Sequence, residues 1–573
     1  MINKNRLWFV SALFFVAIGL VVWRLVTIQI VQRQDWKTRA EAVHERKIRV
    51  QPERGNIYDR QGRILAFNRK AYSIAIDSYD MTKPELLIDI LVDELNTPRS
   101  ELKSLVYRQS YFTWIDRTVN YETGKRIKKR VENANIDGLI ILDTTRRVYP
   151  QDDLGGSIIG FTGVDGEGLA GVEYSQEDVL GGKPEVQKLI YGANRYPYRK
   201  ITLVEGRPGY DVHLTLDLKI QHILKQELRE GVDRFEAKRA WGIVIDPETG
   251  EVLGMSQNEE YNPNNYENYE SSERKILSVS NTFEPGSILK VFSGLAALDY
   301  GVVEPDTTVN GNSPIVLHNH PINNAQYRDY GMVPFTDVIK HSINTGIIRV
   351  AQELGERRLY SFLNKVGFGR ETGVELAEEE SGQLKHYSQW SGLSIGSIPI
   401  GQGISVTALQ LAAKMASVAN GGNLVEPTIV EKVEDPEGNT INSLDREDTI
   451  GGPIASPAST NQMKDMLRLV VEDGTGQNAD IPGYRVSGKT GTAQKAEGGG
   501  YASDKYISSF AGFFPKENPE YLILIVLDEV GTSPVWGGAT AGEIFNRVGT
   551  RILKSVDGEV EKESITSPQG EGL

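Results

Sequence analysis

The stretch Phe283-Glu284-Pro285-Gly286-Ser287-Ile288-Leu289-Lys290, followed by the apolar run from Val291 to Leu298, is the part of the sequence on which the fold prediction depends. Its Pro-Gly pair ends the preceding element, and the apolar residues that follow recur at close to helical spacing. Ser287 should therefore begin a buried helix, with Lys290 one turn further along the same face. A serine hydroxyl attacks well only when a neighbouring base takes its proton, and a desolvated lysine can be that base. The stretch predicts a site of covalent acylation.

A serine three residues before a lysine is common by chance. The chain contains two further copies, Ser100 to Lys103 and Ser272 to Lys275, and each lies in a charged or polar stretch. Ser287 differs from both because a long apolar helix follows it. The chemical interpretation therefore depends on what else the chain contains.

Composition excludes several classes of function. At 573 residues the chain should contain about two to four domains. Its net charge of −14 argues against a general nucleic-acid binder, so no nucleic-acid partner is expected. It has no cysteine, which excludes disulfides and thiolate metal sites, and its seven histidines are scattered without a metal-binding spacing. We therefore expect neither a metal nor another cofactor.

The amino terminus predicts a membrane anchor. Residues 1–6 include two basic residues, and the apolar segment that follows, placed at residues 7–30, is at the short end for a bilayer crossing. Trp8 and Trp23 are placed as interfacial anchors, and the positive-inside rule predicts a cytoplasmic amino terminus. A cleaved signal peptide is the alternative, but no small-x-small cleavage site follows the segment. We expect a single-pass protein of the inner (cytoplasmic) membrane whose larger part is periplasmic or extracellular.

Residues 31–235 are expected to form an elongated, β-rich pedestal domain. Its first part, from Asp35 to Gln51, is charged and predicts a helical stalk. The segment from Arg54 to Ala66 predicts a strand, a turn and a second strand, with Asp59 between two arginines as an internal ion pair. The alternation from Asp211 to Leu218 predicts another strand.

Two further stretches lack any catalytic constellation. Residues 80–140 carry charged helical patterns. Residues 556–573 are acidic and have no apolar periodicity, so a disordered tail is expected.

Residues 236–555 are expected to form a domain of the α+β class. Two strands joined by a tight turn are predicted between Ala240 and Met255. Helices follow, including Leu409 to Ala419, and strands return at Tyr506 to Phe514 and Tyr521 to Asp528. Strands from both ends of the segment can form one sheet, with the helices between them packed on it.

Three short polar elements of this domain could converge in space. They are Ser287-x-x-Lys290, Ser342-Ile343-Asn344 and Lys489-Thr490-Gly491-Thr492. A serine-x-asparagine triplet is weak alone, and Ser342 and Asn344 could instead cap a helix or form a turn. Thr490 and Thr492 could be ordinary strand hydroxyls. Glycines on both sides of Lys489 and Thr490 are, however, typical of a strand edge that a ligand backbone approaches closely.

In this order and at these separations, the three elements resemble the active-site set of the penicillin-binding proteins and serine β-lactamases. Four segments resemble more narrowly a class B penicillin-binding protein, namely Arg54 to Ala66, Gly160 to Glu173, Phe283 to Ser287, and Glu472 to Gly476 ahead of the Lys489 element. That family consists of membrane-anchored, monofunctional D,D-transpeptidases that cross-link peptidoglycan, and the similarity covers nearly the whole chain. Gly163-Val164-Asp165 with Gly168 to Glu173 is more similar to the division branch (septal, FtsI-like) than to the elongation branch.

The resemblance implies a fold and a set of partners. Residues 236–555 would form a penicillin-binding or serine β-lactamase-like transpeptidase domain, and the pedestal would serve dimerisation or partner binding. The substrate would be peptidoglycan stem peptides ending in D-Ala-D-Ala, and β-lactams would inhibit the enzyme. A membrane-embedded glycosyltransferase of the SEDS type and other division proteins would be its partners.

The resemblance also implies catalytic roles. Ser287 would attack the carbonyl between the two terminal D-alanines and form an acyl-enzyme. Lys290 would be the base and must be neutral, which burial and the nearby cation Lys489 both favour. Ser342 would relay the proton to the leaving amine, and Asn344 would orient Lys290 and the substrate amide.

The remaining roles concern substrate binding. The backbone N–H groups of Ser287 and Thr492 would form the oxyanion hole. Lys489, Thr490 and Thr492 would hold the terminal carboxylate of the substrate, with Gly491 on the same strand edge.

Three alternatives remain open. The first is a transpeptidase of the elongation branch. The second is a β-lactamase, but the usual deacylating glutamate motif is not recognisable and a lactamase needs neither anchor nor pedestal. The third is a non-catalytic, membrane-anchored β-lactam sensor or scaffold.

Overall fold

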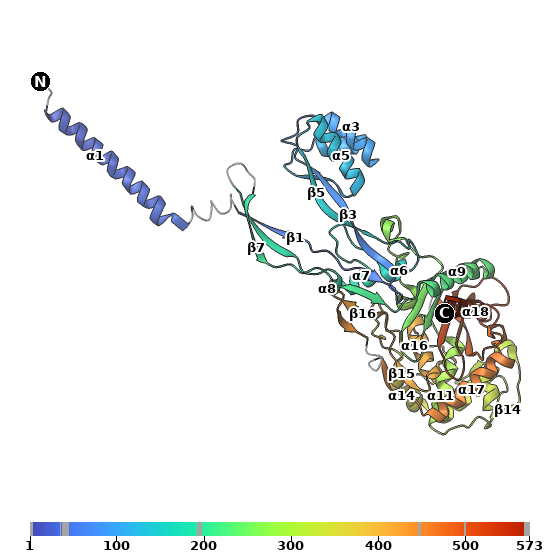
Figure 1. The fold of residues 1–573 in the computed structure, drawn as a ribbon. Helices are drawn as coiled ribbons and strands as arrows, with labels where there is room; N and C mark the ends of the chain where they lie inside the picture. The colour runs from blue at the N-terminus through green and yellow to red at the C-terminus, as the bar shows by residue number, and fades with distance from the viewer. Residues whose placement is uncertain are drawn as a thin grey trace, which may run out of the picture. The chain divides into compact units, whose positions relative to one another are not determined.

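The computed structural model describes residues 4–34, 36, 45–191, 197–444, 449–497 and 500–566 (Figure 1). The chain divides into two units. The first comprises Met1–Glu53 and Gly182–Gly209, and the second comprises Arg54–Gly181 and Tyr210–Leu573. The expected pedestal segment thus contributes to both.

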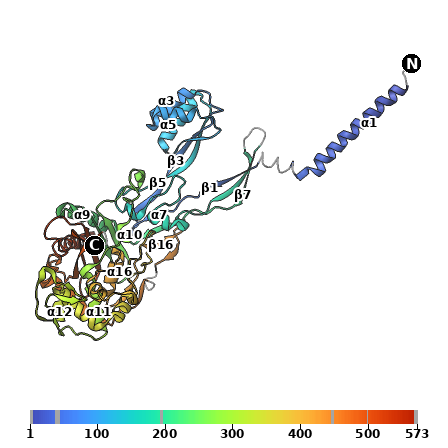
Figure 2. The same cartoon turned by 180° about the vertical axis from the view of Figure 1, so that it is seen from behind.

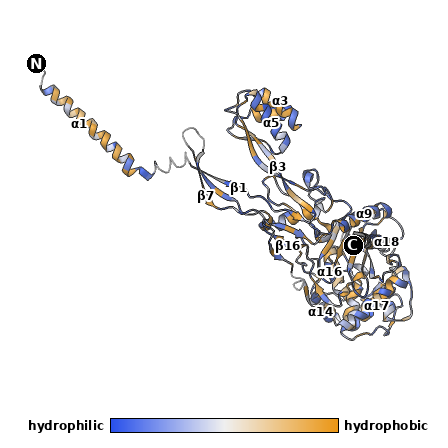
Figure 3. Cartoon of the chain, in the orientation of Figure 1, coloured by the Kyte–Doolittle hydropathy of each residue, from blue (hydrophilic) through white to orange (hydrophobic). Residues whose placement is uncertain are grey.

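The first unit contains the predicted anchor. Helix α1 (Lys4–Val26) continues into a π-helical turn, Thr27–Val31. The segment Leu7–Val31 has a mean hydropathy of 2.3, none of it is buried, and it is long and apolar enough to cross a membrane. Figure 3 draws α1 largely in the orange of hydrophobic residues.

The expected helical stalk is wrong for residues 45–50. Residues Glu45–Val50 form strand β1, which pairs antiparallel with β6 (Glu185–Tyr191), and β6 pairs with β7 (Pro197–Val204). The charged composition of β1 favours a helix locally, but the backbone hydrogen bonds of this three-stranded sheet override that preference. Residue 36 is helical, and residues 35 and 37–44 lie outside the described residues.

A seven-stranded sheet forms the pedestal part of the second unit. Its order is β17-β16-β8-β2-β3-β4, and β5 pairs with β3. The predicted strand-turn-strand is confirmed as β2 (Ile57–Tyr58) and β3 (Ile64–Ile76), with Asp59 accepting a hydrogen bond from Arg63 Nε at 2.7 Å. The other strands are β4 (Thr113–Asn120), β5 (Leu139–Val148), β8 (Asp211–Leu214), β16 (Val430–Glu434) and β17 (Thr440–Ser443).

Helices cover the far end of the β3–β5 pair. They are α3 (Pro84–Leu95), α4 (Arg99–Val106) and α5 (Tyr121–Ala134), as the charged patterns of residues 80–140 predicted. Their apolar faces enclose a separate small core that includes Ile74, Leu87 and Ile127. Figures 1 and 2 show α3 and α5 beside this end of β3 and β5.

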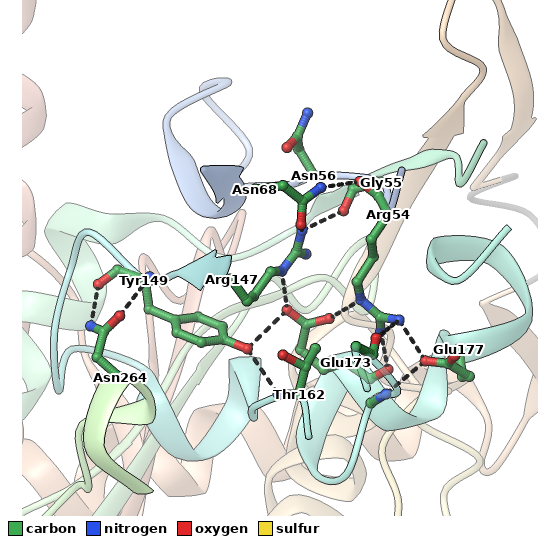
Figure 4. Close-up of polar contacts among 12 residues, drawn as sticks. Arg54, Gly55, Asn56, Asn68, Arg147, Tyr149, Thr162, Glu173, Glu177 and Asn264 are labelled. Carbon is green, nitrogen blue, oxygen red and sulfur yellow. Dashed lines mark hydrogen bonds and ion pairs between the residues drawn. The ribbon is translucent and has the colours of Figure 1, made fainter. Parts of the chain in front are cut away.

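A buried ion-pair network joins two segments that the sequence singled out, Arg54 to Ala66 and Gly160 to Glu173, to the end of strand β5. The Glu173 carboxylate is fully buried and accepts from Arg54 Nε and from Arg147 Nε, each at 2.7 Å (Figure 4). Tyr149 donates to the same carboxylate at 3.2 Å, and Glu177 accepts from Arg54 at 2.6 Å. A buried carboxylate is tolerated only when it is paired and hydrogen-bonded. The network therefore fixes α7 (Gly171–Ser175) and α8 (Glu177–Leu180) beside β2, β3 and β5.

The second sheet has five antiparallel strands in the order β10-β9-β21-β20-β19. They are β9 (Arg239–Ile245), β10 (Val252–Gln257), β19 (Ser487–Glu497), β20 (Gly500–Phe514) and β21 (Tyr521–Asp528). Alternate residues of β21 enter two different cores. Strands from both ends of the domain thus share one sheet, which confirms the α+β prediction.

Helices cover both faces of this sheet. On one face, α9 (Leu218–Phe235) and α18 (Ala541–Thr566) pack around Ile523, Ile525 and Phe545. On the other face the main helices are α11 (Leu289–Asp299), α16 (Ala408–Ala419) and α17 (Pro457–Asp473).

The smaller elements lie in the loops and layers around these helices. The helices are α6 (Gly156–Ile159), α10 (Leu277–Ser280), α12 (Phe335–Lys340), α13 (Asn344–Leu354), α14 (Glu356–Val366) and α15 (Ser394–Ser397). The strands are β11 (Thr308–Asn310), β12 (Ile315–Leu317), β13 (His320–Ile322), β14 (Met332–Pro334), β15 (Asn423–Val425) and β18 (Ile450–Pro453).

Two boundaries differ from those expected. Helix α9 precedes residue 236, where we began the C-terminal domain, yet it packs on the sheet of that domain. Helix α18 continues to Thr566 and so includes the first eleven residues of the segment expected to be disordered. Glutamate and lysine are good helix formers, so the acidic composition that suggests disorder is also compatible with a helix. Residues 567–573 lie outside the described residues.

Candidate active site

The Ser287 segment is held against strand β19. Residues Gly286–Ile288 form a single 3-10 turn that leads into the fully buried start of α11, and Ser287 itself is half-buried. Gly286 has φ +54°, and a Cβ atom added to it would lie 2.9 Å from the carbonyl oxygen of Thr492. Only glycine fits this left-handed conformation and this close approach. The predicted helix start is confirmed.

Lys290 lies one turn further on and is completely buried. Its Nζ atom donates to the Ser342 carbonyl at 2.5 Å and to Asn344 Oδ1 at 2.6 Å, and it lies 3.0 Å from Ser342 Oγ. A neutral amine has two N–H donors and one lone pair. Because the carbonyl and the amide oxygen take the two donors, the lone pair is available to accept a proton from a hydroxyl.

Ser342 occupies a strained position between α12 and α13. Its φ is +57°, which L residues rarely adopt, and strain of this kind collects at functional sites. Its Oγ lies 3.0 Å from Lys290 Nζ and 3.0 Å from Lys489 Nζ. Asn344 does not cap α13, because its Oδ1 accepts from Lys290 and its Nδ2 donates to the Asn323 carbonyl at 2.9 Å. The geometry therefore favours the chemical interpretation of this triplet over a helix cap.

Strand β19 supplies the third element. Lys489 is fully buried and points to Ser342, and Thr490 shares a hydroxyl contact of 2.9 Å with Thr475. Thr492 Oγ1 accepts from the Gly537 backbone N–H at 3.1 Å. A Cβ atom on Gly491 would lie 3.0 Å from the Pro285 carbonyl and would collide with the Ser509 hydroxyl. The structure thus brings together all three sequence elements.

Burial controls the electrostatics of the two lysines. It lowers the pKa of Lys290 well below the ordinary value, and the charge of Lys489 lowers it further. Burial also lowers the pKa of Lys489 to about 7. No carboxylate forms an ion pair with either amine in the described part of the chain. The lowered pKa of Lys290 favours the neutral amine, as a catalytic base requires.

The decoy copies of the serine-lysine motif behave as surface residues. Ser100 and Lys103 lie exposed on α4, and Ser272 is exposed in a loop. Within the residues that the structure describes, no group of three or more histidine or acidic side chains could hold a metal ion.

Sequence reasoning missed a contact that joins three segments beside Ser287. Glu284 Oε1 accepts from the Gly403 backbone N–H at 2.8 Å and from the Tyr501 hydroxyl at 3.2 Å. Its other oxygen is buried without a hydrogen-bond partner, and burial raises the pKa of this carboxyl. A charged residue directly before an apolar Pro-Gly turn is the signal that could have identified Glu284. No local signal identifies the Gly537 N–H as a partner of Thr492.

Comparison with known proteins identifies the family. The family described as penicillin binding protein transpeptidase domain matches residues 241–549, and the penicillin-binding protein dimerisation domain matches residues 49–214. The chain therefore belongs to the penicillin-binding protein transpeptidase family. The presence of both domains makes it a class B member, that is, a peptidoglycan D,D-transpeptidase.

Full-length relatives share this organisation. Peptidoglycan D,D-transpeptidase FtsI of Buchnera aphidicola is 30% identical over 566 residues, which cover 96% of this chain and 95% of that protein. Stage V sporulation protein D of Bacillus subtilis is 29% identical over 558 residues, covering 95% and 85% respectively. The solved structure of penicillin binding protein 3 from Mycobacterium tuberculosis with aztreonam is 26% identical, has a TM-score of 0.69, and is matched over 89% of this chain and 97% of that chain.

Proposed function

We propose that this protein is a septal peptidoglycan D,D-transpeptidase that works through a Ser287 acyl-enzyme. The observation that carries the proposal is the buried chain of contacts from Lys290 to Ser342 to Lys489. A structural lysine is normally paired with an acid when buried, as Lys225 is with Asp153 at 2.8 Å. Lys290 has no such partner among the described residues, which supports a neutral amine that can act as a base.

The first half of the reaction forms the acyl-enzyme. Ser287 Oγ attacks the carbonyl carbon between the two terminal D-alanines, and Lys290 Nζ takes the hydroxyl proton. The C–N bond then breaks, the acyl group stays on Ser287, and the departing D-alanine nitrogen receives a proton through the Ser342 hydroxyl. Asn344 keeps Lys290 aimed at the reacting oxygen through its 2.6 Å contact.

The second half transfers the acyl group. The amine of a second stem peptide attacks the ester carbonyl and loses its proton to Lys290, and Ser287 leaves with a proton. The products are a peptide cross-link and the free enzyme. Backbone N–H groups of Ser287 and Thr492 stabilise the oxyanion in both halves, where each donor typically supplies about 3 kcal/mol.

Strand β19 binds the substrate terminus. Lys489, Thr490 and Thr492 hold the carboxylate of the terminal D-alanine, or the carboxylate of a β-lactam that imitates it. Gly491 lacks a side chain where Ser509 and Pro285 crowd the strand. The Mycobacterium tuberculosis relative was solved in complex with aztreonam, which supports β-lactam binding by this protein.

The anchor and the pedestal suit work on a membrane-attached polymer. The amino terminus lies in the cytoplasm, and the transpeptidase domain lies on the periplasmic or extracellular side. A SEDS-type glycosyltransferase and other division proteins are the expected partners. The segment from Gly163 to Glu173 and the FtsI name of a relative favour the division branch, and the elongation branch is the nearest alternative. A scaffold without catalysis is disfavoured because it would not need an unpaired buried lysine beside Ser342.

Acylation by penicillin tests the catalytic assignment. The detergent-solubilised full chain should gain the mass of one penicillin, measured by intact mass spectrometry, and Ser287→Ala should gain none. Ser272→Ala is the matched control, since it alters an exposed copy of the same motif, and should be acylated as the parent is. No adduct on the parent, or an adduct that persists in Ser287→Ala, would reject the proposal.

The position of the protein in dividing cells tests whether it belongs to the division branch or the elongation branch. A fluorescent fusion to the cytoplasmic amino terminus should gather at midcell in dividing cells. A uniform signal along the lateral wall would assign the protein to the elongation branch instead.

A further inference from the structure

Two arginines stand directly opposite each other on the β3–β5 pair of the pedestal. Arg69 of β3 and Arg146 of β5 are register partners in this antiparallel ladder. Side chains at such positions are only about 4.5–5.5 Å apart at their Cβ atoms, and like charges placed there destabilise the sheet. Both side chains are exposed, so they are not held there by packing. An anion bound between the two guanidinium groups would remove this repulsion.

The protein itself does not supply that anion within the residues that the structure describes. Neither Arg69 nor Arg146 makes an ion pair or a side-chain hydrogen bond, and the same holds for the neighbouring Lys70. Eight other arginines of the pedestal are paired with acids, namely Arg54, Arg60, Arg63, Arg99, Arg117, Arg126, Arg130 and Arg147, whereas exposed residues such as Arg108 and Arg229 have no ion pair within the described residues. What distinguishes Arg69 and Arg146 from the other unpaired arginines is that they lie directly opposite each other in the ladder.

Arg69 and Arg146 line one pocket. Its volume is about 190 Å³, and it is lined by Arg69, Lys70, Ala71, Asn120, Arg146, Val148 and Asn264. One water occupies about 30 Å³ of liquid, so the pocket has room for a small anion with several waters. The lining joins the β3–β5 pair, the residue that caps α5, and the loop at Asn264 of the transpeptidase side.

The two asparagines differ in what they can offer a ligand. Asn264 is already fixed, because it accepts from the Tyr149 backbone N–H at 3.1 Å and donates to the Tyr149 carbonyl at 2.8 Å (Figure 4). Asn120 uses only its Oδ1, which accepts from the Glu122 backbone N–H at 3.1 Å. Its Nδ2 has no hydrogen-bond partner in the described ranges and can donate to an anion.

We propose that this pocket binds a phosphate group. Two guanidinium groups on the same face of the strand pair line it. A phosphate carries up to two charges and several acceptor oxygens, whereas a carboxylate carries one charge and two oxygens. Guanidinium forks bind phosphate oxygens in pairs, so Arg69 and Arg146 can each contribute two parallel hydrogen bonds. The phosphate is either a free ion or part of a lipid headgroup, and both have the same binding chemistry.

Thermal unfolding of the full chain tests the proposal. Inorganic phosphate should raise the melting temperature in detergent at constant ionic strength, with chloride as the reference salt. The variant Arg69→Gln with Arg146→Gln should raise the Kd for phosphate by about tenfold or more. The control Arg108→Gln with Lys128→Gln makes the same charge change at exposed positions outside the pocket and should leave the Kd unchanged.

A second comparison separates the two sources of phosphate. The full chain in phosphatidylcholine nanodiscs is compared with the same sample containing phosphatidic acid. Stabilisation by phosphatidic acid that the double variant loses assigns a lipid headgroup, and stabilisation by inorganic phosphate only assigns a soluble phosphate.

The double variant should also fold well. Without phosphate it should melt at or above the temperature of the parent, because the repulsion between the arginines is gone. Arg69→Lys, which keeps the charge and removes the fork, should weaken phosphate binding by a smaller factor. The proposal is overturned if neither inorganic phosphate in detergent nor phosphatidic acid in nanodiscs stabilises the parent. It is also overturned if the control variant loses phosphate binding as much as the double variant does, or if a poly-glutamate peptide stabilises the parent more than phosphate does.

Discussion

Removing the charge of Lys489 should shift the pH dependence of Ser287 acylation. The change Lys489→Met keeps an unbranched side chain of similar length and removes the ammonium. Lys290 works as a base only when it is neutral. Without its cationic neighbour, the pKa of Lys290 rises, so a higher pH is needed to reach the same neutral fraction. The rising limb of the acylation profile should therefore move to higher pH.

The size of the shift follows from the geometry. Both Nζ atoms lie 3.0 Å from Ser342 Oγ, so they are at most about 6 Å apart. At that separation and an effective dielectric constant of about 20, two unit charges repel by about 3 kcal/mol, which corresponds to about two pKa units. Because the pKa of Lys489 is about 7, it is only partly charged at neutral pH. We expect the limb to move upward by about one to two pH units.

The assay is the second-order rate constant for acylation by a fluorescent penicillin, measured across the pH range on the detergent-solubilised full chain. Lost binding of the β-lactam carboxylate would lower the rate at every pH, whereas the electrostatic effect is recovered at alkaline pH. Lys414→Met is the control, since Lys414 is a buried lysine of α16 whose pKa is lowered to about 8. A midpoint in Lys489→Met that stays in place or moves to lower pH would refute the reasoning.

Three further outcomes are expected. The pKa of Lys489 is about 7 in the folded state and about 10.4 when unfolded, so the unfolded chain binds more protons between these values and stability should rise with pH there. At pH 7, the free energy of unfolding of Lys489→Met should therefore exceed that of the parent by a few kcal/mol, measured by denaturant titration. A parent protein with the same denaturant midpoint at pH 7 and at pH 10 would count against this prediction. Ser342→Gly should relieve the strain of φ +57° and stabilise the fold by about 1 kcal/mol, yet slow acylation by orders of magnitude; retained acylation would remove Ser342 from the mechanism. Glu173→Gln should cost about 3–5 kcal/mol because it leaves two buried arginines under-paired, whereas Glu177→Gln, at a side chain 40% exposed, should cost less in the same denaturant titration.

The sequence could predict elements whose cause is local. The Pro-Gly turn and the apolar run sufficed for the start of α11, and turn residues between two alternating segments sufficed for the β9–β10 hairpin. The convergence of Ser287, Ser342 and Lys489 was predicted only through resemblance. Nothing local relates Ser342 to a strand that begins at Ser487.

Long-range pairing explains what the sequence could not predict. Strand β16 joins the pedestal sheet by pairing with β8, although more than two hundred residues separate the two strands. The local sequence of β16 does not indicate which strand it pairs with. Strand β1 has the composition of a charged helix, but it is a strand because its backbone pairs antiparallel with β6. The contact of Glu284 with Tyr501 likewise depends on where the β19–β20 hairpin returns in space. In each case the deciding interaction is a tertiary contact that overrides local propensity.

Several residues of the active site lower the stability of the fold. Lys290 and Lys489 are buried without acids among the described residues, and Ser342 adopts a backbone conformation that costs about 1–3 kcal/mol. These costs are met elsewhere, in the apolar cores on both faces of the five-stranded sheet. A carboxylate beside Lys290 would stabilise the fold, but it would raise the pKa of the amine and keep it protonated. The absence of such a carboxylate from the described residues therefore lowers the stability of the fold but lets Lys290 stay neutral. Only the neutral amine has a lone pair that can accept the proton of Ser287.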